Sequence, residues 1–375
     1  MTRKPSLGFD RAAFMRRYWQ RAPLLLRGAF PRFADPLSVR DVLALAASDE
    51  AESRLVVRRA GRWSLERGPF APSRFKQLPR RDWTVLVQDT NHFSPRADAL
   101  LSRFDFIPHA RIDDVMVSYA APGGGVGPHV DSYDVFLLQG LGRRRWRISR
   151  QRDLSLVEGL DLKILARFRP TDEWVLEPGD MLYLPPGVAH EGVALDECLT
   201  WSIGFRAPAD AELVEGFLDF LRDRLRPGGQ YRDPGATPAR HPGAIAPAMV
   251  EHASRVLATI RWTPRMVREY VGCALSEPKA HVFFRPPRKP LARAAFERLG
   301  KRRGLALDSR ARLLFSGTMF FLNGEPAHVP RPARAVARRL SDARRLPAPL
   351  AAPRGFWDIA HAWYLRGFVG IGEET

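Results

Sequence analysis

The sequence predicts an α+β protein with an antiparallel β-barrel or sandwich at its centre and helices on either side of it. Short apolar and alternating runs follow one another between about residues 54 and 206, separated by Gly/Pro turns, and this pattern is typical of antiparallel barrels. Helical periodicity is found before and after this region. With 375 residues and 45% hydrophobic content, the chain can bury a sizeable core, and its length predicts two or three domains.

The segment before the barrel predicts two helices and one short strand. The stretch FDRAAFMRRYWQRAPLLLRGAF at 9–30 predicts a helix that leads into a strand at about 24–26, and VRDVLALAA at 39–47 predicts a second helix. The start of the chain is basic but has no apolar stretch, and no segment approaches the ~18 uninterrupted apolar residues of a membrane span. We therefore expect a cytoplasmic protein that has no membrane partner.

The barrel region contains eight runs with strand character. In order they read RLVVRR, WTVLVQD, DDVMVSYA, DVFLLQG, RRRWRIS, EWVLEPG, DMLYLPPG and CLTWSIGFR. After them the chain changes to helical spacing at 212–225, and two more helices are expected at about 246–261 and 263–275.

The last hundred residues predict a winged-helix-like module. A hairpin is expected at 312–329, with Asn323 and Gly324 as its turn, and helical stretches follow at 333–346 and 355–368.

The composition is strongly basic, with a formal net charge of +18 and a pI near 10.9. Basic surfaces attract nucleic acids, but only six of the 59 basic residues are lysines, and the arginines are spread over the whole chain. Such arginine usage often reflects genome composition. The charge is therefore compatible with a ribonucleoprotein neighbourhood and does not require direct contact with nucleic acid.

Three residues of the predicted barrel form a candidate metal site. The motif GGGVGPHVD at 123–131 places His129 and Asp131 two residues apart, so that on an extended segment both side chains point to one spot. His190 follows a Pro-Pro-Gly turn and is expected at the start of a strand. Two histidines and a carboxylate make the facial triad that holds Fe(II) with open positions. The alternative is that all three are ordinary structural or surface residues.

The run GRRRWRIS predicts an arginine inside the barrel. Alternation puts Arg144, Trp146 and Ile148 on one face, and because Trp and Ile belong in a core, Arg144 should point inward. A buried arginine beside a metal implies a ligand with a carboxylate, bound through two hydrogen bonds. The alternative is an internal salt bridge with a carboxylate of the protein.

Alternation on two further strands predicts the rest of the pocket. In LTWSIGFR the small residues share one face of the strand, and these are Thr200, Ser202 and Gly204. Small side chains on the face toward the barrel interior leave room for a cofactor. On DDVMVSYA one face carries a carboxylate at the pocket rim and a hydroxyl deeper inside, in the order Asp114, Met116 and Ser118. Tyr133 shares the face of His129 and Asp131.

The motifs GGGVGPHVDSYDVFLLQGLGRRRWRI, EPGDMLYLPPGVAHEG and WSIGFRAP resemble the JmjC-type cupin oxygenases, and most closely the bacterial ribosomal oxygenases. YWQRAPLLLRGAFP, LVQDTNHF and DDVMVSYA also fit this family, so that the resemblance covers most of the chain. It implies a double-stranded β-helix (jelly-roll) barrel. It also implies a dioxygenase that uses Fe(II), 2-oxoglutarate and dioxygen to hydroxylate an arginine to 3-hydroxyarginine. The substrate that the resemblance implies is ribosomal protein number sixteen of the large (50S) subunit.

The resemblance also implies roles for individual residues. His129, Asp131 and His190 become the iron ligands and catalytic residues, and Arg144 becomes the partner of the distal carboxylate of 2-oxoglutarate. Further cosubstrate candidates are Ser118 and Ser202. The substrate would meet Asp114, Met116 and Tyr133, with Asp114 on the guanidinium and the other two against its methylene stem. The alternative for Met116 and Tyr133 is a place in the core.

The same resemblance implies a domain organisation. The oxygenase domain would span 1–207, with its barrel core at about 95–207, followed by a helical dimerisation region at 208–275 and a winged-helix-like domain at 276–375. The partners would be a ribosomal protein as substrate and a second copy of the chain in a homodimer.

Two other functions stay open at this point. One keeps the oxygenase chemistry but acts on a histidine, on a lysine or on RNA, as JmjC relatives do. The other is a non-catalytic cupin that binds ribosomes or RNA through its basic surface. A protein that binds neither iron nor 2-oxoglutarate would favour this second function.

Overall fold

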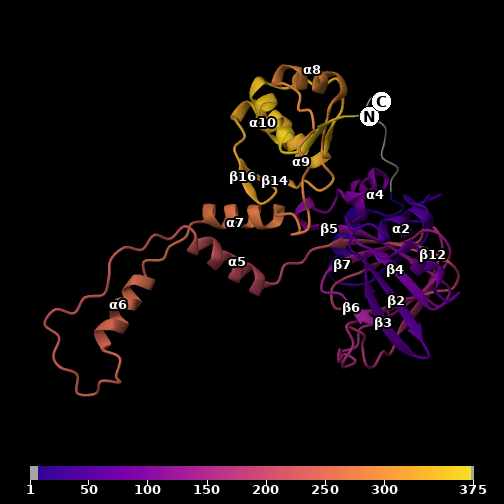
Figure 1. Ribbon diagram of the computed structural model, residues 1–375, viewed down its shortest axis with the longest axis horizontal. Coiled ribbons are helices and arrows are strands. Elements are labelled where there is room, and N and C mark those ends of the chain that lie inside the picture. The colour runs from indigo at the N-terminus through magenta and orange to yellow at the C-terminus, as the bar shows by residue number, and fades with distance from the viewer. Residues whose placement is uncertain (1–6, 373–375) are drawn as a thin grey trace.

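The computed structural model describes residues 7–372. A β-barrel forms the largest part of the molecule, an arm of helices extends from it, and a smaller α/β unit lies above the barrel in the view of Figure 1. In this described range no helix is both long and apolar enough to cross a membrane.

Two antiparallel sheets build the barrel. The larger sheet has the strand order β1-β10-β7-β12-β5-β4-β2-β3. Its strands are β1 (Leu24–Leu26), β2 (Ser53–Arg59), β3 (Arg62–Arg67), β4 (Trp83–Val87), β5 (Ile112–Ala120), β7 (Asp134–Gln139), β10 (Met181–Leu184) and β12 (Cys198–Phe205). The smaller sheet has the order β6-β11-β8-β9. Its strands are β6 (His129–Val130), β8 (Arg144–Ser149), β9 (Asp172–Leu176) and β11 (Ala189–Ala194).

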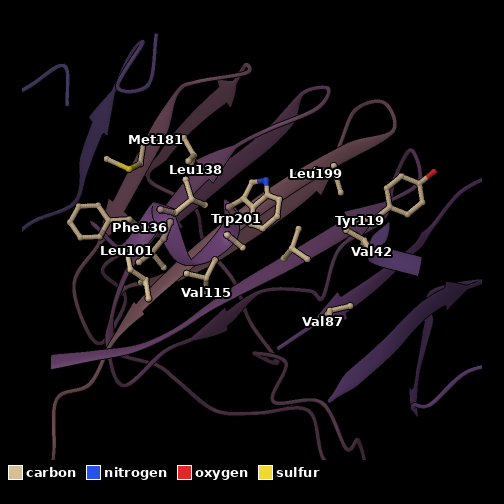
Figure 2. Close-up of a cluster of buried hydrophobic side chains, with 14 of the residues drawn as sticks. Val42, Val87, Leu101, Val115, Tyr119, Phe136, Leu138, Met181, Leu199 and Trp201 are labelled. Atoms are coloured by element: carbon tan, nitrogen blue, oxygen red, sulfur yellow. The ribbon is translucent and has the colours of Figure 1, made fainter. Parts of the chain in front are cut away.

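The main core lies between the outer face of the large sheet and the helices that cover it. These helices are α1 (Arg11–Arg17), α2 (Val39–Ala46), α3 (Pro72–Lys76) and α4 (Pro95–Leu101), with short 3-10 turns at η1 (Thr90–His92), η2 (Ser102–Phe104) and η3 (His109–Arg111). Leu199 and Trp201 of β12 point into this core together with Leu101 of α4 (Figure 2). Because neighbouring residues of a strand face opposite ways, Thr200 and Ser202 point into the barrel instead, as the alternation predicts.

All eight strands predicted for the barrel region exist, and so does the short strand predicted at 24–26, which is β1. The strand expected to start at His190 is β11, which begins one residue earlier. Two strands of the barrel, β3 and β6, were not predicted. The edge strand β3, RWSLER, is largely polar, and β6 has only two residues, so neither carries the apolar alternation by which strands are recognised in a sequence.

The helical arm contains α5 (Asp210–Arg222), α6 (Pro247–Leu257) and α7 (Pro264–Ser276). Helix α7 runs beneath the C-terminal unit, whereas α6 and the loop before it extend away from the rest of the molecule (Figure 1). All three helices lie where the sequence predicts them.

The C-terminal unit has its own hydrophobic core. Its elements are α8 (Arg293–Arg303), β13 (Leu305–Leu307), β14 (Leu313–Ser316), β15 (Met319–Leu322), β16 (Glu325–Ala327), η4 (Arg331–Ala333), α9 (Arg334–Ala343), β17 (Arg345–Leu346), α10 (Arg354–Leu365) and β18 (Val369–Ile371). They form two three-stranded sheets, β17-β13-β18 and β14-β15-β16.

Two predictions for this unit need correction. The expected hairpin is a three-stranded meander: Asn323 and Gly324, with φ of 52° and 85°, join β15 to β16, and Gly317 turns the chain between β14 and β15. The helix expected at 333–346 ends at Ala343, because Arg344 takes a left-handed conformation with φ of 58° and the next two residues pair as β17. Helix α8 was not predicted because most of its residues are charged or small.

Candidate metal centre and cosubstrate pocket

The paired strands β6 and β11 bring His129, Asp131 and His190 together. His190 is the register partner of His129, and Asp131 follows directly after β6. One oxygen of Asp131 lies 3.9 Å from Nε2 of His129 and the other lies 3.6 Å from Nε2 of His190. The three ligand atoms all lie within 4.8 Å of one another. The three residues that the sequence predicts as a metal site therefore lie together in the structure.

Hydrogen bonds orient both imidazole rings for metal binding. Nδ1 of His129 donates to the carbonyl of Gly127 and Nδ1 of His190 donates to the carbonyl of Val188, each over 3.0 Å. A carbonyl only accepts, so the proton of each neutral ring is on Nδ1 and Nε2 keeps its lone pair. Burial, followed by the neighbouring His129, lowers the pKa of His190 to about 4, so this ring is neutral at neutral pH. Two such nitrogens and one carboxylate fit Fe(II).

The glycines of the motif allow its backbone to pack directly on neighbouring strands. A Cβ on Gly124 would lie 2.0 Å from the carbonyl oxygen of Trp83, and one on Gly125 would lie 2.4 Å from that of Gly192. Any side chain at these positions would push the segment off β4 and β11. The two glycines thus set the path of the chain into His129.

Arg144 points into the barrel, as the alternation on β8 predicts, and is 5% exposed. Its Nη1 donates to Oγ of Ser118 on β5 over 3.2 Å and to Oγ1 of Thr200 on β12 over 3.3 Å. Its Nε is buried without a hydrogen-bond partner. Within residues 7–372 no carboxylate forms an ion pair with Arg144, which rules out an internal salt bridge there. Its unused donors fit the carboxylate of a ligand such as 2-oxoglutarate.

The sequence predicted that Thr200 faces the pocket but not that it contacts Arg144, and it did not indicate Gln139 at all. The hydroxyl of Thr200 donates to Oε1 of Gln139 over 3.1 Å, which leaves its oxygen free to accept from Arg144. The amide of Gln139 donates in turn to three backbone carbonyls, of which that of Leu141 is nearest at 2.9 Å. The face that Thr200 shares with Ser202 was the signal that could have named it as a partner of Arg144. Ser202 is 8% exposed, and no other described residue hydrogen-bonds to its hydroxyl.

The predicted substrate residues lie at one end of the barrel. A Cβ on Gly204 would lie 3.4 Å from Oδ1 of Asp114 and 3.8 Å from Cε2 of Tyr133, so both side chains meet over this glycine. Tyr133 also lines a cavity of about 410 Å³ together with Leu213 of α5 and Tyr270 of α7. Met116 and Tyr133 are only partly buried, so neither is a fully enclosed core residue.

Asp114 differs from the prediction in its depth. It was expected at the pocket rim, but it is only 4% exposed because Lys279, from the segment after α7, covers it. The sequence could not indicate this contact, since the two residues are 165 positions apart.

An antiparallel barrel with a His-Asp-His cluster and a buried arginine that has no carboxylate partner among the described residues is typical of oxygenases of the cupin class. Two family descriptions match the chain, "JmjC domain" at residues 99–213 and "ROXA-like winged helix" at residues 259–368. The ribosomal protein uL16 3-hydroxylase of Escherichia coli K12 is 36% identical over 365 residues, which cover 94% of this chain and 97% of that protein. The chain therefore belongs to the JmjC-type ribosomal oxygenases.

Other relatives agree with this assignment. A probable ribosomal oxygenase of Haemophilus influenzae is 40% identical over 208 residues, covering 54% of this chain and 51% of that protein. The crystal structure of YcfD from E. coli superposes with a TM-score of 0.85 at 33% identity, covering 97% and 99% of the two chains. The same E. coli ribosomal oxygenase in complex with cobalt and 2-oxoglutarate gives 0.82 at 32% identity, covering 98% and 99%.

Proposed function

We propose that this chain is an Fe(II)- and 2-oxoglutarate-dependent dioxygenase that hydroxylates carbon 3 of an arginine in the large-subunit ribosomal protein uL16. The observation that carries the proposal is the buried guanidinium of Arg144, which has no carboxylate partner among the described residues and shares the barrel with the His-Asp-His cluster. The substrate is inferred from the E. coli relative, whose name is uL16 3-hydroxylase.

The polar residues of the site bind either the metal or 2-oxoglutarate in this proposal. The metal is held by Nε2 of His129, Nε2 of His190 and the carboxylate of Asp131. The distal carboxylate of 2-oxoglutarate binds Arg144, which Ser118 and Thr200 keep in place, and Ser202 offers a free hydroxyl to the same ligand. When bound, Fe(II) with 2-oxoglutarate and dioxygen supplies the oxidising power for the hydroxylation of a C–H bond. The chain itself orients these groups and keeps bulk water out of the barrel.

The substrate arginine enters beside Tyr133. Its guanidinium binds the carboxylate of Asp114, and its methylene stem packs against Met116 and the ring of Tyr133. This arrangement explains why an acidic residue lies at the mouth of the barrel in a strongly basic protein. A neutral side chain would leave the buried Asp114 without a charged partner on its open side.

We also propose that two chains assemble through the helical arm and that the protein works in the cytoplasm. Several large apolar side chains of the arm are exposed, and they are Val214, Leu218, Met249, Val250, Leu257 and Trp262. A patch of this kind favours contact with another protein surface. The domain bounds of 207/208 and 275/276 remain predictions, and they fall between β12 and α5 and within α7.

The test is an in vitro reaction with recombinant uL16. The purified chain is incubated with Fe(II), 2-oxoglutarate and air, and the substrate is digested and analysed by mass spectrometry. We expect the mass of one oxygen to be gained on a single arginine peptide, and no gain with the variant Asp131→Ala. Turnover of 2-oxoglutarate without oxygen on uL16 would point to a different substrate. A folded protein that binds neither metal nor 2-oxoglutarate would contradict the oxygenase proposal itself.

A further inference from the structure

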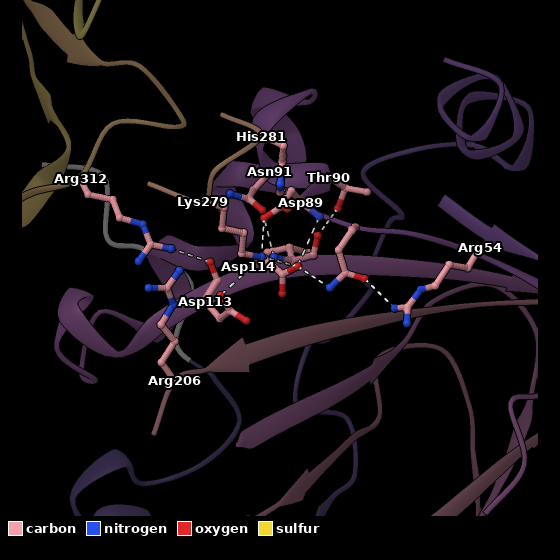
Figure 3. A network of polar contacts seen from close by, with 12 residues as sticks. Arg54, Asp89, Thr90, Asn91, Asp113, Asp114, Arg206, Lys279, His281 and Arg312 are labelled. Atoms are coloured by element: carbon pink, nitrogen blue, oxygen red, sulfur yellow. Dashed lines mark hydrogen bonds and ion pairs between the residues drawn. The ribbon is translucent and has the colours of Figure 1, made fainter. Parts of the chain in front are cut away.

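Lys279 reaches from outside the barrel into a group of three aspartates at its mouth (Figure 3). Its ammonium lies 3.0 Å from Oδ1 of Asp89, 3.4 Å from Oδ1 of Asp113 and 3.4 Å from Oδ2 of Asp114. Only 21% of its side chain is exposed. Burial lowers the pKa of Lys279, but the three carboxylates, led by Asp114, raise it above its ordinary value overall. The lysine is therefore charged at neutral pH.

The two oxygens of Asp114 have different surroundings. Its Oδ2 accepts from Nε2 of Gln88 over 2.8 Å and lies 3.4 Å from both the backbone nitrogen of Asp89 and the ammonium of Lys279. No described residue donates a hydrogen bond to Oδ1. This second oxygen faces the space over Gly204, beside the ring of Tyr133. One oxygen is thus fixed from the outside, and the other is left for a donor that comes from the barrel mouth.

We propose that Lys279 is a positioning residue for the substrate, because its ammonium holds Oδ2 of Asp114, keeps that carboxylate charged and so presents Oδ1 to the entering guanidinium. This inference rests on the proposed function and extends it. It gives the segment that leads into the C-terminal unit a part in substrate recognition, although that segment lies outside the barrel.

The charge of Asp114 depends on few neighbours. Burial raises its pKa to about 6; Lys279 works against this rise, and Asp89 and Asp113 add to it. The other groups around it are occupied elsewhere. Arg206 binds the carboxylate of Asp113, and Arg312 donates to the main-chain carbonyl of Asp113. His281 binds Asp89, and Arg54 binds Gln88. Tyr133 is close by, and burial raises its pKa, so the phenol is neutral. Lys279 is therefore the cation on which ionisation of Asp114 near neutral pH depends most.

The test compares Lys279→Met and Lys279→Arg with the wild type, and Lys289→Met serves as the matched control because this lysine is exposed. We expect Lys279→Met to raise the KM for recombinant uL16 about twofold at pH 7, because a rise of one unit in the pKa of Asp114, from about 6 to about 7, lowers its ionised fraction from about nine-tenths to one-half. The acidic limb of kcat/KM should move to higher pH, while kcat at saturating uL16 and the KM for 2-oxoglutarate stay close to wild type. Lys279→Arg keeps the positive charge, so its KM for uL16 and its pH profile should lie close to those of the wild type.

A second measurement needs no substrate. In protein labelled with ¹³C at aspartate carboxyl carbons, the Asp114 signal, assigned with Asp114→Asn, should titrate at higher pH in Lys279→Met than in wild type. An unchanged Asp114 titration would overturn the inference. A lower KM in Lys279→Met would also overturn it, because Lys279 would then compete with the substrate. A loss of thermal stability with an unchanged pH profile would reduce Lys279 to a structural role. If the wild type does not hydroxylate uL16, the proposed function fails, and the titration alone decides whether Lys279 charges Asp114.

Discussion

Arg144 of β8 donates a hydrogen bond to Ser118 of β5 across the interior of the barrel, over 3.2 Å between Nη1 and Oγ. This contact links the small sheet, which carries both histidines of the metal site, to the large sheet. The guanidinium is held from one side only, since its Nε is buried without a partner. A preformed and incompletely satisfied cation of this kind is suited to bind the carboxylate of a ligand.

Replacing Arg144 by methionine should remove the anchor of 2-oxoglutarate. Truncation of one partner of a buried charge pair costs on the order of 2–5 kcal/mol, so the KM for 2-oxoglutarate should rise at least about tenfold. Succinate production at varied 2-oxoglutarate measures this change. Arg143→Met is the control, because Arg143 is half exposed and pairs with Asp196 on the surface. An unchanged KM in Arg144→Met would show that 2-oxoglutarate binds elsewhere.

Thr200→Val should weaken the same site by a smaller amount. Valine keeps the shape of the side chain but removes the oxygen that accepts from Arg144 and the proton donated to Gln139. One hydrogen bond contributes about 1 kcal/mol, so we expect a roughly fivefold rise in the KM for 2-oxoglutarate, with iron affinity unchanged. Thr171→Val, at an exposed position just before β9, is the comparison. A wild-type KM would remove Thr200 from the pocket.

His92 should make folding stability depend on pH. Burial lowers its pKa from 6.5 to about 4 in the folded protein, so between these values the unfolded chain binds the extra proton. The stability that the neutral ring contributes is complete above about pH 6.5 and is lost as the pH falls toward 4. We expect the free energy of unfolding, measured in urea, to be lower at pH 5 than at pH 7 in the wild type. In His92→Gln this difference should be smaller by about 1–2 kcal/mol. It should persist in His241→Gln, which changes an exposed loop. Equal differences in all three proteins would contradict this account.

The exposed apolar residues of the arm should hold two chains together. Leu218 on α5 and Leu257 on α6 are 60% and 64% exposed. Charges at both positions, in Leu218→Glu with Leu257→Glu, should shift sedimentation from a dimer to a monomer at micromolar concentration without unfolding the barrel. Leu141→Glu, at a residue that is 42% exposed on a barrel loop, should leave the dimer intact. A wild-type protein that sediments as a monomer would refute the proposed assembly.

The sequence predicted the parts of the site that depend on local pattern. The i, i+2 spacing of His129 and Asp131, the turn before His190 and the alternation around Arg144 each follow from strand geometry, so a few residues suffice to infer them. Contacts between distant segments leave no such trace. Lys279 meets Asp89 across 190 positions, and Thr200 reaches Gln139 across 61, so these pairs became visible only in the folded chain.

The same division applies to the fold. Strands such as β5, β7 and β12 were predictable because their side chains alternate between the main core and the barrel interior. The end of α9 was not predictable. The helix ends at a left-handed Arg344, whereas glycine or asparagine usually takes this conformation at a helix end, and the strand that follows, β17, has only two residues. Tertiary pairing with β13, and not local propensity, decides the conformation there.

The central claim is that this chain oxidises an arginine of a ribosomal protein. The most direct measurement is the intact mass of all ribosomal proteins from cells with and without this gene, grown with sufficient oxygen and iron. The account predicts that uL16 is heavier by one oxygen atom in cells that carry the gene, and that the Asp131→Ala allele does not restore this mass. Identical spectra of all ribosomal proteins in the two strains would contradict it.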